Sequence, residues 1–304
     1  MQSAAQAAQP TVAGISAQLE HLWKTIDAYF ATFGPKDWTR KHGKHWTFAD
    51  VPYHLSYFDR VMCAHPIEAG DALPESERPL MRTMGELNAW NDREFAKRPA
   101  GQTVEKSLEE MRAVRDSIRR SLARMSGASL NNRAYISLAI FNGWRTKFAC
   151  LATVRTHTWA HVQQLRFNAG IKSPLPDPAV AAPAIDGFLQ AMPALVNSAA
   201  APEKGFRLTF DLTAPGGGVW TVIVEKGGGR LVRERVPNPD LVMKMSTDTF
   251  SKAIWAEMQN PMVAMLTRKI KVKGFMKLGA FSKIMPRPAV DTPLKTLDSL
   301  TVMP

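Results

Sequence analysis

Two histidines, His157 and His161, stand four residues apart in a segment rich in aromatic and apolar side chains. On an α-helix, residues at this spacing share a face, and their Cβ atoms lie about 5–6 Å apart. Two imidazoles in this arrangement can hold one metal ion, as paired histidines do in metalloenzymes. The spacing alone is a weak signal, because a metal site needs at least one further ligand from elsewhere in the chain.

His54 is the best placed third ligand, since it falls midway along another segment with helical spacing of apolar residues. Facing helices of a bundle build metal sites in the core. Three neutral imidazoles leave one coordination position open, which is typical of a catalytic site rather than a structural one. His45 and His65 are the alternatives if His54 does not ligate.

Polar neighbours orient metal-bound imidazoles through the ring N–H that faces away from the metal. Asp50 and Gln164 are candidates for this role, although Asp50, three residues after Thr47, also fits a helix-capping residue. Tyr53 and Arg155 flank the histidines closely in sequence. On a helix they therefore point away from the metal-binding face, and we expect both on the surface.

Four segments with apolar residues at three- and four-residue spacing must position these histidines. They are residues 11–33, a helix that starts near Thr47, a helix capped by Thr103 and residues 146–168, with a short extra helix at 81–96. Gly170 is the expected C-cap of the last helix. Amphipathic helices with looped connections predict an all-α, up-down four-helix bundle over residues 1–170.

The second half of the chain has a different pattern. Residues 171–183 contain four prolines, which predicts a stiff linker and a domain boundary. Period-two runs separated by glycine and proline clusters then predict antiparallel strands. The expected elements are a helix at 184–196, strands at 206–212, 219–224, 230–236 and 241–245, a helix at 248–258, a strand at 270–272 and a helix at 275–284. This predicts an α+β domain with a mainly antiparallel sheet over residues 184–290, followed by a tail at 291–304.

Composition limits the class of protein. A chain of 304 residues suggests two domains. With 45% hydrophobic and 22% charged residues it is neither disordered nor collagen-like. The two cysteines, Cys63 and Cys150, exclude a disulfide scaffold. Since no apolar run approaches ~20 residues and the N-terminus lacks the pattern of a secretory signal, we expect a soluble, cytoplasmic protein.

The net charge of +12 favours anionic partners. The densest basic stretch, residues 258–290, contains seven Lys and Arg and no acidic residue. Acidic lipid headgroups on a membrane surface and phosphate-bearing ligands both suit such a stretch. Nucleic acid is disfavoured, because the sequence shows neither a reading module nor interleaved aromatic and basic residues. The simpler alternative is a solvated basic face.

Two motifs resemble signatures of the DinB-like bundle family. Residues 46–55, Trp-Thr-Phe-Ala-Asp-Val-Pro-Tyr-His-Leu, are similar to its second helix. Phe-Asn-Gly-Trp at 141–144 and His-x3-His-x2-Gln-Leu at 157–165 are similar to its fourth helix. The resemblance covers roughly residues 11–170. The chain departs from the family in a long insertion around residues 67–100, and some relatives have Glu where this chain has His157.

The resemblance implies that His54, His157 and His161 form a metal triad. Zinc is the first expectation, and three imidazoles also suit nickel, copper or iron. An open three-histidine site lowers the pKa of bound water to ~7 or binds a thiol as the nucleophilic thiolate. The second chemistry fits the thiol-transferase relatives of this family, so a low-molecular-weight thiol is the expected co-substrate.

The second half resembles the sterol carrier protein type 2 fold over about residues 184–290. The segments that carry the likeness are 206–214, 219–225, 238–246, 260–262 and 269–278. The resemblance implies an apolar tunnel for sterols, fatty acids or acyl-CoA. Seven of the fifteen methionines lie between residues 240 and 290, and methionine suits adaptable apolar cavities. Alternatively, these side chains simply fill the core.

A bundle followed by such a domain is also the arrangement of the mycothiol-dependent maleylpyruvate isomerase family, and Phe-Leu-Gln-Ala-Met-Pro-Ala-Leu at 188–195 is similar to the start of its second domain. We therefore expect a metal-dependent enzyme of the thiol-dependent transferase or isomerase kind, with a second domain that binds an apolar ligand. The alternative is a lipid, sterol or acyl-CoA carrier in which the bundle is a scaffold. The sequence leaves the substrate and the oligomeric state open.

Overall fold

The computed structural model describes residues 10–42, 46–79, 81–137, 143–171, 177–255, 265 and 267–285. The backbone contacts group these residues into two compact units, and the division falls within one helix, between Thr158 and Trp159. The first unit is helical and the second is built on a β-sheet. None of the described helices is long and apolar enough to cross a bilayer.

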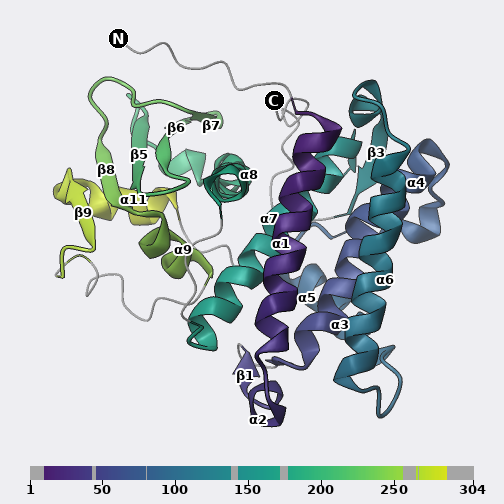
Figure 1. Cartoon of the computed structure of the whole chain (residues 1–304). Coiled ribbons are helices and arrows are strands. Elements are labelled where there is room, and N and C mark those ends of the chain that lie inside the picture. The colour runs from purple at the N-terminus through teal and green to yellow at the C-terminus, as the bar shows by residue number, and fades with distance from the viewer. Residues whose placement is uncertain are drawn as a thin grey trace. The chain divides into compact units, whose positions relative to one another are not determined.

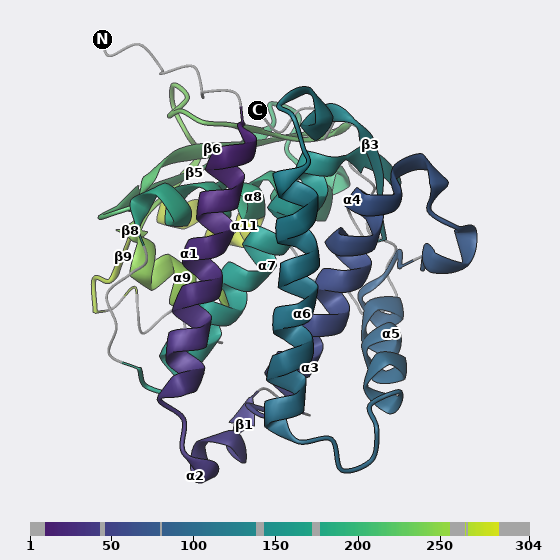
Figure 2. The same cartoon turned by 45° about the vertical axis from the view of Figure 1, so that its right-hand side comes forward.

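Long helices dominate the first unit, and α1, α3 and α6 run alongside one another (Figures 1 and 2). The longer helices are α1 (Val12–Ala31), α3 (Asp50–Asp59), α5 (Met84–Ala96), α6 (Val104–Ala123) and α7 (Lys147–Asn168). Shorter helices are α2 (Pro35–Trp38) and α4 (His65–Ala69), and a π-helical turn at Arg60–Ala64 joins α3 to α4. Two hairpins complete the unit, β1 (Lys41–His42) with β2 (Trp46–Thr47), and β3 (Arg133–Ile136) with β4 (Gly143–Thr146).

One core joins the four bundle helices. Each presents an apolar stripe to it, as in the series Met111, Val114, Ile118 and Leu122 along α6. Thr103 begins α6, because its hydroxyl accepts a hydrogen bond from the backbone N–H of Lys106. The four-helix bundle predicted from the sequence is confirmed.

The end of α7 follows the sequence prediction. Gly170 adopts φ +71°, and the N–H of Ile171 donates to the carbonyl of Arg166 at 2.9 Å. This is the pattern of a left-handed glycine cap, which any residue with a Cβ adopts only with strain. The cap therefore fixes where α7 ends, and both candidate ligands lie on this helix, His157 at its middle and His161 one turn later.

Several elements of the helical unit were not predicted. The hairpin β3–β4 stands immediately before α7, where the sequence indicated only a connection. The second bundle helix was expected to be continuous, but it changes to a π-helical turn after Asp59. A turn of this kind accommodates one extra residue in a helix, and apolar periodicity does not reveal it. Residues 138–142, which include part of the fourth-helix motif, lie outside the described residues.

The second unit contains a five-stranded sheet in the order β7-β6-β5-β8-β9. Its strands are β5 (Phe206–Thr213), β6 (Gly218–Glu225), β7 (Gly228–Val232), β8 (Leu241–Ser246) and β9 (Ile270–Lys273). All pairs are antiparallel except β5 with β8, so the sheet is mainly antiparallel, as predicted. The helices are α8 (Pro178–Leu195), α9 (Thr247–Trp255) and α11 (Leu278–Ile284).

Aromatic side chains fill the space between this sheet and its helices. Phe210 on β5 lies 5.9 Å from Phe250 on α9, and Phe250 lies 6.2 Å from Phe188 on α8, measured between ring centroids. Trp255 closes the group against Phe188 at 4.7 Å. These edge-on and tilted arrangements are the ones that aromatic rings prefer.

The helix α8 begins earlier than the sequence indicated, inside the proline-rich stretch. Asp177 caps it by accepting a hydrogen bond from the N–H of Ala179 at 2.7 Å, and Pro178 occupies the first helical position. Proline is favoured there, because its missing N–H would have no partner inside the helix. Residues 172–176 of the expected linker, residues 256–258 of the expected helix and the tail at 291–304 lie outside the described residues.

Candidate metal centre

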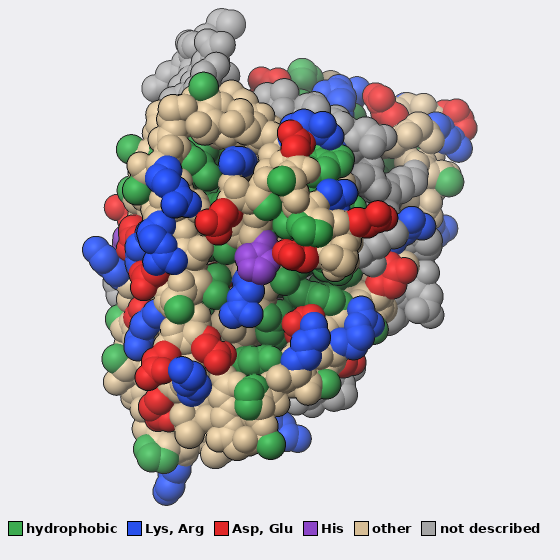
Figure 3. Space-filling view, turned by 90° about the vertical axis from the view of Figure 1, so that its right-hand side faces the viewer, with side chains coloured by type: hydrophobic (Ala, Val, Ile, Leu, Met, Phe, Trp, Pro, Cys, Tyr) green, Lys and Arg blue, Asp and Glu red, His purple; other side chains and the backbone are tan. Residues whose placement is uncertain are grey.

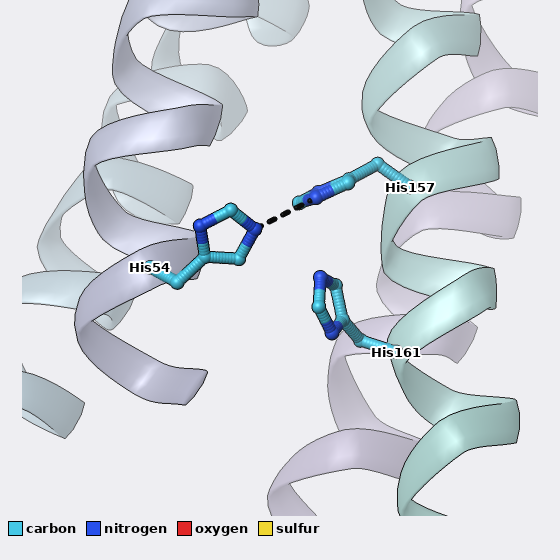
Figure 4. Close-up of side chains that lie close together, drawn as sticks. All are labelled: His54, His157 and His161. Carbon is cyan, nitrogen blue, oxygen red and sulfur yellow. Dashed lines mark hydrogen bonds between the residues drawn. The ribbon is translucent and has the colours of Figure 1, made fainter. Parts of the chain in front are cut away.

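Three histidines from two helices converge in the bundle (Figure 4). His54 comes from α3, and His157 and His161 come from successive turns of α7. One ring nitrogen of each lies within 4.8 Å of the other two. The Nε2 atoms of His54 and His157 lie 3.0 Å apart. The three side chains predicted from the sequence therefore share one site.

The start of α3 is fixed by a carboxylate. Asp50 accepts hydrogen bonds from the backbone N–H of Thr47 at 2.7 Å and from its hydroxyl at 2.8 Å. The guanidinium of Arg98 binds the other carboxylate oxygen at 2.8 Å. These bonds set where the helix begins and place His54 one turn into it. Asp50 thus acts at the helix start, the simpler of the two roles that the sequence suggested.

The hydroxyl of Tyr57 determines which ring nitrogen of His54 carries the proton. Its Nδ1 lies 2.6 Å from the hydroxyl oxygen of Tyr57, and that hydroxyl donates to the amide oxygen of Asn91 at 3.0 Å. Because Tyr57 donates its only hydroxyl proton in the hydrogen bond to Asn91, its oxygen accepts a hydrogen bond from Nδ1–H of the imidazole. The lone pair of His54 is then on Nε2, which faces His157.

Desolvation keeps the imidazoles of His54 and His157 neutral. Desolvation lowers the pKa of His54 well below its ordinary value, and repulsion from His157 and His42 lowers it further. Desolvation also lowers the pKa of His157 to about 3. A neutral imidazole is the form that binds a metal ion, and these rings are neutral near pH 7 without any metal.

Aromatic rings surround the histidines. Phe58 stacks on His157 with centroids 3.5 Å apart, and Trp46 lies 4.6 Å from His54. Phe95 lies parallel to His54 at 6.5 Å. The exposed fraction of His54 is 4% and that of His161 is 6%. Such a lining excludes water and strengthens electrostatic interactions inside the site.

The donor set fits a divalent transition metal. Two imidazole nitrogens bound to one tetrahedral zinc ion lie about 3.3 Å apart, given bonds of about 2.0–2.1 Å. The observed 3.0 Å between His54 and His157 is close to this distance. Within the described parts of the chain, no other group of three His, Cys, Asp or Glu side chains has such an arrangement.

Comparison with protein families agrees with this geometry. Residues 18–165 match the DinB superfamily, and residues 188–285 match the SCP-2 sterol transfer family. The chain is a DinB superfamily domain followed by an SCP-2 domain. A search of curated proteins finds no significant match.

One solved structure supports a shared fold. A histidine-to-alanine mutant of mycothiol-dependent maleylpyruvate isomerase aligns with a TM-score of 0.51 and 9% identity, over 80% of this chain and 90% of that one. A second structure of the same isomerase gives a TM-score of 0.48 with the same identity and coverage. At this identity the first alignment supports a common fold for the DinB and SCP-2 domains.

Of the other histidines considered as ligands, His65 does not join the cluster. His65 lies on α4, half-exposed, with its Nδ1 3.2 Å from the carboxylate of Glu77. His45 lies outside the described residues. The role of Gln164 in orienting an imidazole remains a prediction.

Two residues expected on the surface of the DinB domain are buried. Tyr53 is 8% exposed, and its hydroxyl donates to the carbonyl of Glu94 at 3.0 Å. Arg155 is 5% exposed and donates to the side chain of Gln18 at 2.8 Å. The surface prediction was wrong because neighbouring helices cover the faces next to the histidines: α5 covers Tyr53 and α1 covers Arg155.

Sequence reasoning missed Tyr57 and Asn91. Tyr57 stands three residues after His54, and this spacing on a helix could have indicated a contact. Asn91 belongs to α5, within the insertion that departs from the family pattern. Nothing in the sequence near Asn91 links it to a histidine 37 residues earlier.

Proposed function

We propose that the DinB domain is the catalytic part of a metal-dependent enzyme of the thiol-dependent transferase or isomerase kind. His54, His157 and His161 would hold the metal, with zinc as the first candidate and nickel or iron as alternatives. The observation that carries the proposal is the convergence of three imidazoles from α3 and α7. Those of His54 and His157 are neutral near pH 7, and the Nε2 lone pair of His54 is directed into the site by its contact with Tyr57.

A divalent metal bound by three imidazoles supplies Lewis acidity and lowers the pKa of a water or thiol in its open position. The protein's own side chains would position the metal ligands and exclude water. Tyr57 and Asn91 hold His54 in one tautomer, and Phe58 holds the plane of the His157 ring. The aromatic lining would exclude bulk water and favour an organic co-substrate over water.

A low-molecular-weight thiol is the proposed co-substrate. The support is the shared fold with an isomerase whose name includes its thiol, mycothiol. The protein's own cysteines are unsuited to that role. Desolvation raises the pKa of the Cys63 thiol well above its ordinary value and that of Cys150 to about 12, and both side chains are fully buried. A thiolate nucleophile would therefore come from a separate molecule.

The SCP-2 domain is proposed to bind an apolar, lipid-like ligand. The support is the match to a sterol transfer family over residues 188–285 and the aromatic and apolar lining between its sheet and helices. This observation also favours the second candidate function, a lipid carrier in which the DinB domain is only a scaffold. The two candidates differ in whether the histidines bind a metal.

Metal analysis of the purified full-length protein separates these functions. The enzyme predicts one metal ion per chain, retained through gel filtration and lost in the variant His157→Ala, while the far-ultraviolet circular dichroism is unchanged. Metal content at background level, together with fatty acids or sterols in an organic extract of the protein, would instead favour the carrier. A metal-loaded protein that has no activity with thiols and electrophilic alkenes would refute the proposed reaction class.

A further inference from the structure

Two large apolar side chains are exposed on the SCP-2 domain. Phe275 is 59% exposed and Met276 is 95% exposed. Among the described residues, only Ile254 at 40% is another large hydrophobic side chain in this class. Met276 is also one of the methionines expected to line a cavity, and its position on the surface contradicts that expectation. Adjacent exposed apolar residues of this size often mark an interaction site.

The backbone holds these two residues in an ordered turn. Strand β9 ends at Lys273, and the next residue, Gly274, adopts φ +86°. A Cβ at Gly274 would lie 2.1 Å from the carbonyl oxygen of Asp240. Only glycine fits this position. The next residues form a 3₁₀ turn in which the N–H of Lys277 donates to the carbonyl of Gly274 at 2.8 Å. The exposure of Phe275 and Met276 is therefore built into the turn.

Lysines surround this apolar pair. Lys271 and Lys273 on β9 and Lys277 in the turn are all exposed, and none forms an ion pair within the described chain. Lys271 stands directly opposite Lys244 in the β8–β9 register. Like charges in this position destabilise a sheet unless an anion lies between or near them.

Two of these lysines, Lys271 and Lys273, border a hollow. It has a volume of about 320 Å³, and its lining includes Lys244, Lys271 and Lys273 together with Arg235 and Asp211. The single carboxylate, Asp211, pairs with both Arg235 and Lys244. The positive charge in the hollow therefore exceeds the negative charge, which suits an anionic group from outside the protein.

We propose that this surface, the β9 tip, docks the SCP-2 domain onto an anionic membrane. The β9 tip consists of Lys271, Lys273, Phe275, Met276 and Lys277. Its lysines would contact acidic lipid headgroups, and its two apolar side chains would enter the boundary between headgroups and acyl chains. Neither function proposed for the interior of the two domains requires this surface, so the proposal stands independently of them.

The combination of groups distinguishes a membrane from other anions. A free phosphate or a nucleic acid backbone would be held by cations alone and would gain nothing from Phe275 and Met276. A neutral protein partner would gain nothing from the unpaired lysines. Another face of the molecule, drawn in Figure 3, shows acidic and basic side chains intermixed. At the β9 tip, by contrast, every charged side chain is a lysine.

Co-sedimentation of the full chain with lipid vesicles tests the proposal. We expect binding to phosphatidylcholine vesicles that contain phosphatidylglycerol, weaker binding at high salt and little binding to pure phosphatidylcholine. The triple variant Lys271→Gln, Lys273→Gln and Lys277→Gln should bind at least about tenfold more weakly, since each lysine near an anionic surface contributes severalfold. A matched control carries the same substitution at three exposed, ion-paired lysines, Lys106, Lys204 and Lys226, and should bind like the wild type.

A second measurement reports on the apolar pair directly. The variant Met276→Cys can be labelled with an environment-sensitive fluorophore, because both native cysteines are buried. Its emission should shift to shorter wavelength with anionic vesicles, whereas a label at the exposed position Glu203→Cys should not respond. The proposal is overturned if the wild type does not bind anionic vesicles, if the lysine variant binds like its control, or if the Met276 label stays in water. It is also overturned if inorganic phosphate or duplex DNA displaces the protein from vesicles at equal charge concentration.

Discussion

The hydroxyl of Tyr57 accepts a hydrogen bond from Nδ1–H of His54 at 2.6 Å, and this contact leaves the lone pair of His54 on Nε2, the nitrogen that faces His157. The contact depends in turn on Asn91, whose amide oxygen accepts a hydrogen bond from the hydroxyl of Tyr57 at 3.0 Å. An imidazole held in this way binds a metal more tightly than one free to exchange tautomers, because no rearrangement precedes ligation.

Replacing Tyr57 by Phe should weaken metal binding about 10- to 100-fold, the range expected for losing a partner that orients a ligand. Competition between the protein and a chromogenic chelator measures the change. The matched control is Tyr53→Phe, which removes a buried hydroxyl of the same helix that bonds to Glu94 instead of an imidazole. Equal metal affinity in both variants would show that the tautomer of His54 is not set by Tyr57.

Replacing His54 by Ala should reduce metal content as severely as replacing His161 by Ala, because each supplies one of only three imidazoles. Elemental analysis of the dialysed proteins measures this. The variant His65→Ala should keep its metal, since His65 pairs with Glu77 outside the cluster. Full occupancy in the His54 variant would mean that another residue completes the site.

A buried carboxyl group makes the stability of the DinB domain depend on pH. Asp59 is 1% exposed, neither of its oxygens has a hydrogen-bond partner, and burial raises its pKa from 3.8 to about 7 although Arg115 lowers it. Between these pKa values the folded state keeps a proton that the unfolded state has lost. The free energy of unfolding therefore falls as the pH rises from about 4 to 7 and then stays at the lower value.

The variant Asp59→Asn should remove this dependence and gain stability at pH 8, by up to a few kcal/mol on the scale of 1.36 kcal/mol per pKa unit. Chemical unfolding at pH 4, 6 and 8 measures the difference, with the exposed Asp116→Asn as control. Parallel pH profiles for wild type and the Asp59 variant would contradict a raised pKa for Asp59.

A fragment of residues 178–304 should fold alone, because it contains the whole sheet together with α8, α9 and α11. A cooperative thermal transition followed by circular dichroism is the expected result. A shorter fragment that begins at residue 197 lacks α8, whose Asp186 binds Trp220 on β6 and Arg233 after β7. It should melt at lower temperature or without cooperativity. A fragment 178–304 without a transition would show that the sheet needs the bundle to fold.

The sequence was sufficient to predict the helices and strands, because their apolar residues recur at regular spacing. The periodicity of apolar residues predicted the bundle helices, and the alternation from Phe206 onward predicted the sheet. The same spacing argument placed His157 and His161 on one face of a helix. The position of His54 midway along another amphipathic segment made it the best placed third ligand, and the family resemblance implied the same residue. These inferences succeeded because each depends on residues near one another in the chain or on a motif of known role.

The remaining features depend on contacts between distant segments. Asn91 reaches Tyr57 only because α5 folds back against α3, and local sequence contains no sign of that packing. Tyr53 and Arg155 flank the histidines on faces that an isolated helix would expose to water, yet α5 and α1 cover them. Gly274 could be recognised as a turn residue, but its consequence, the exposure of Phe275 and Met276, follows from the close approach of Asp240.

The π-helical turn at Arg60–Ala64 has a consequence for the geometry of the site. One additional residue in a helical turn rotates everything beyond it by about 100° relative to an uninterrupted α-helix. Because of this rotation, His54 on α3 can face α7 while Ile67 on α4 still faces the apolar interior. Deleting a single amino acid from this turn would rotate α4 relative to α3, so that His54 and Ile67 could not both keep their present directions. Insertions and deletions should therefore be tolerated far less here than in the loops.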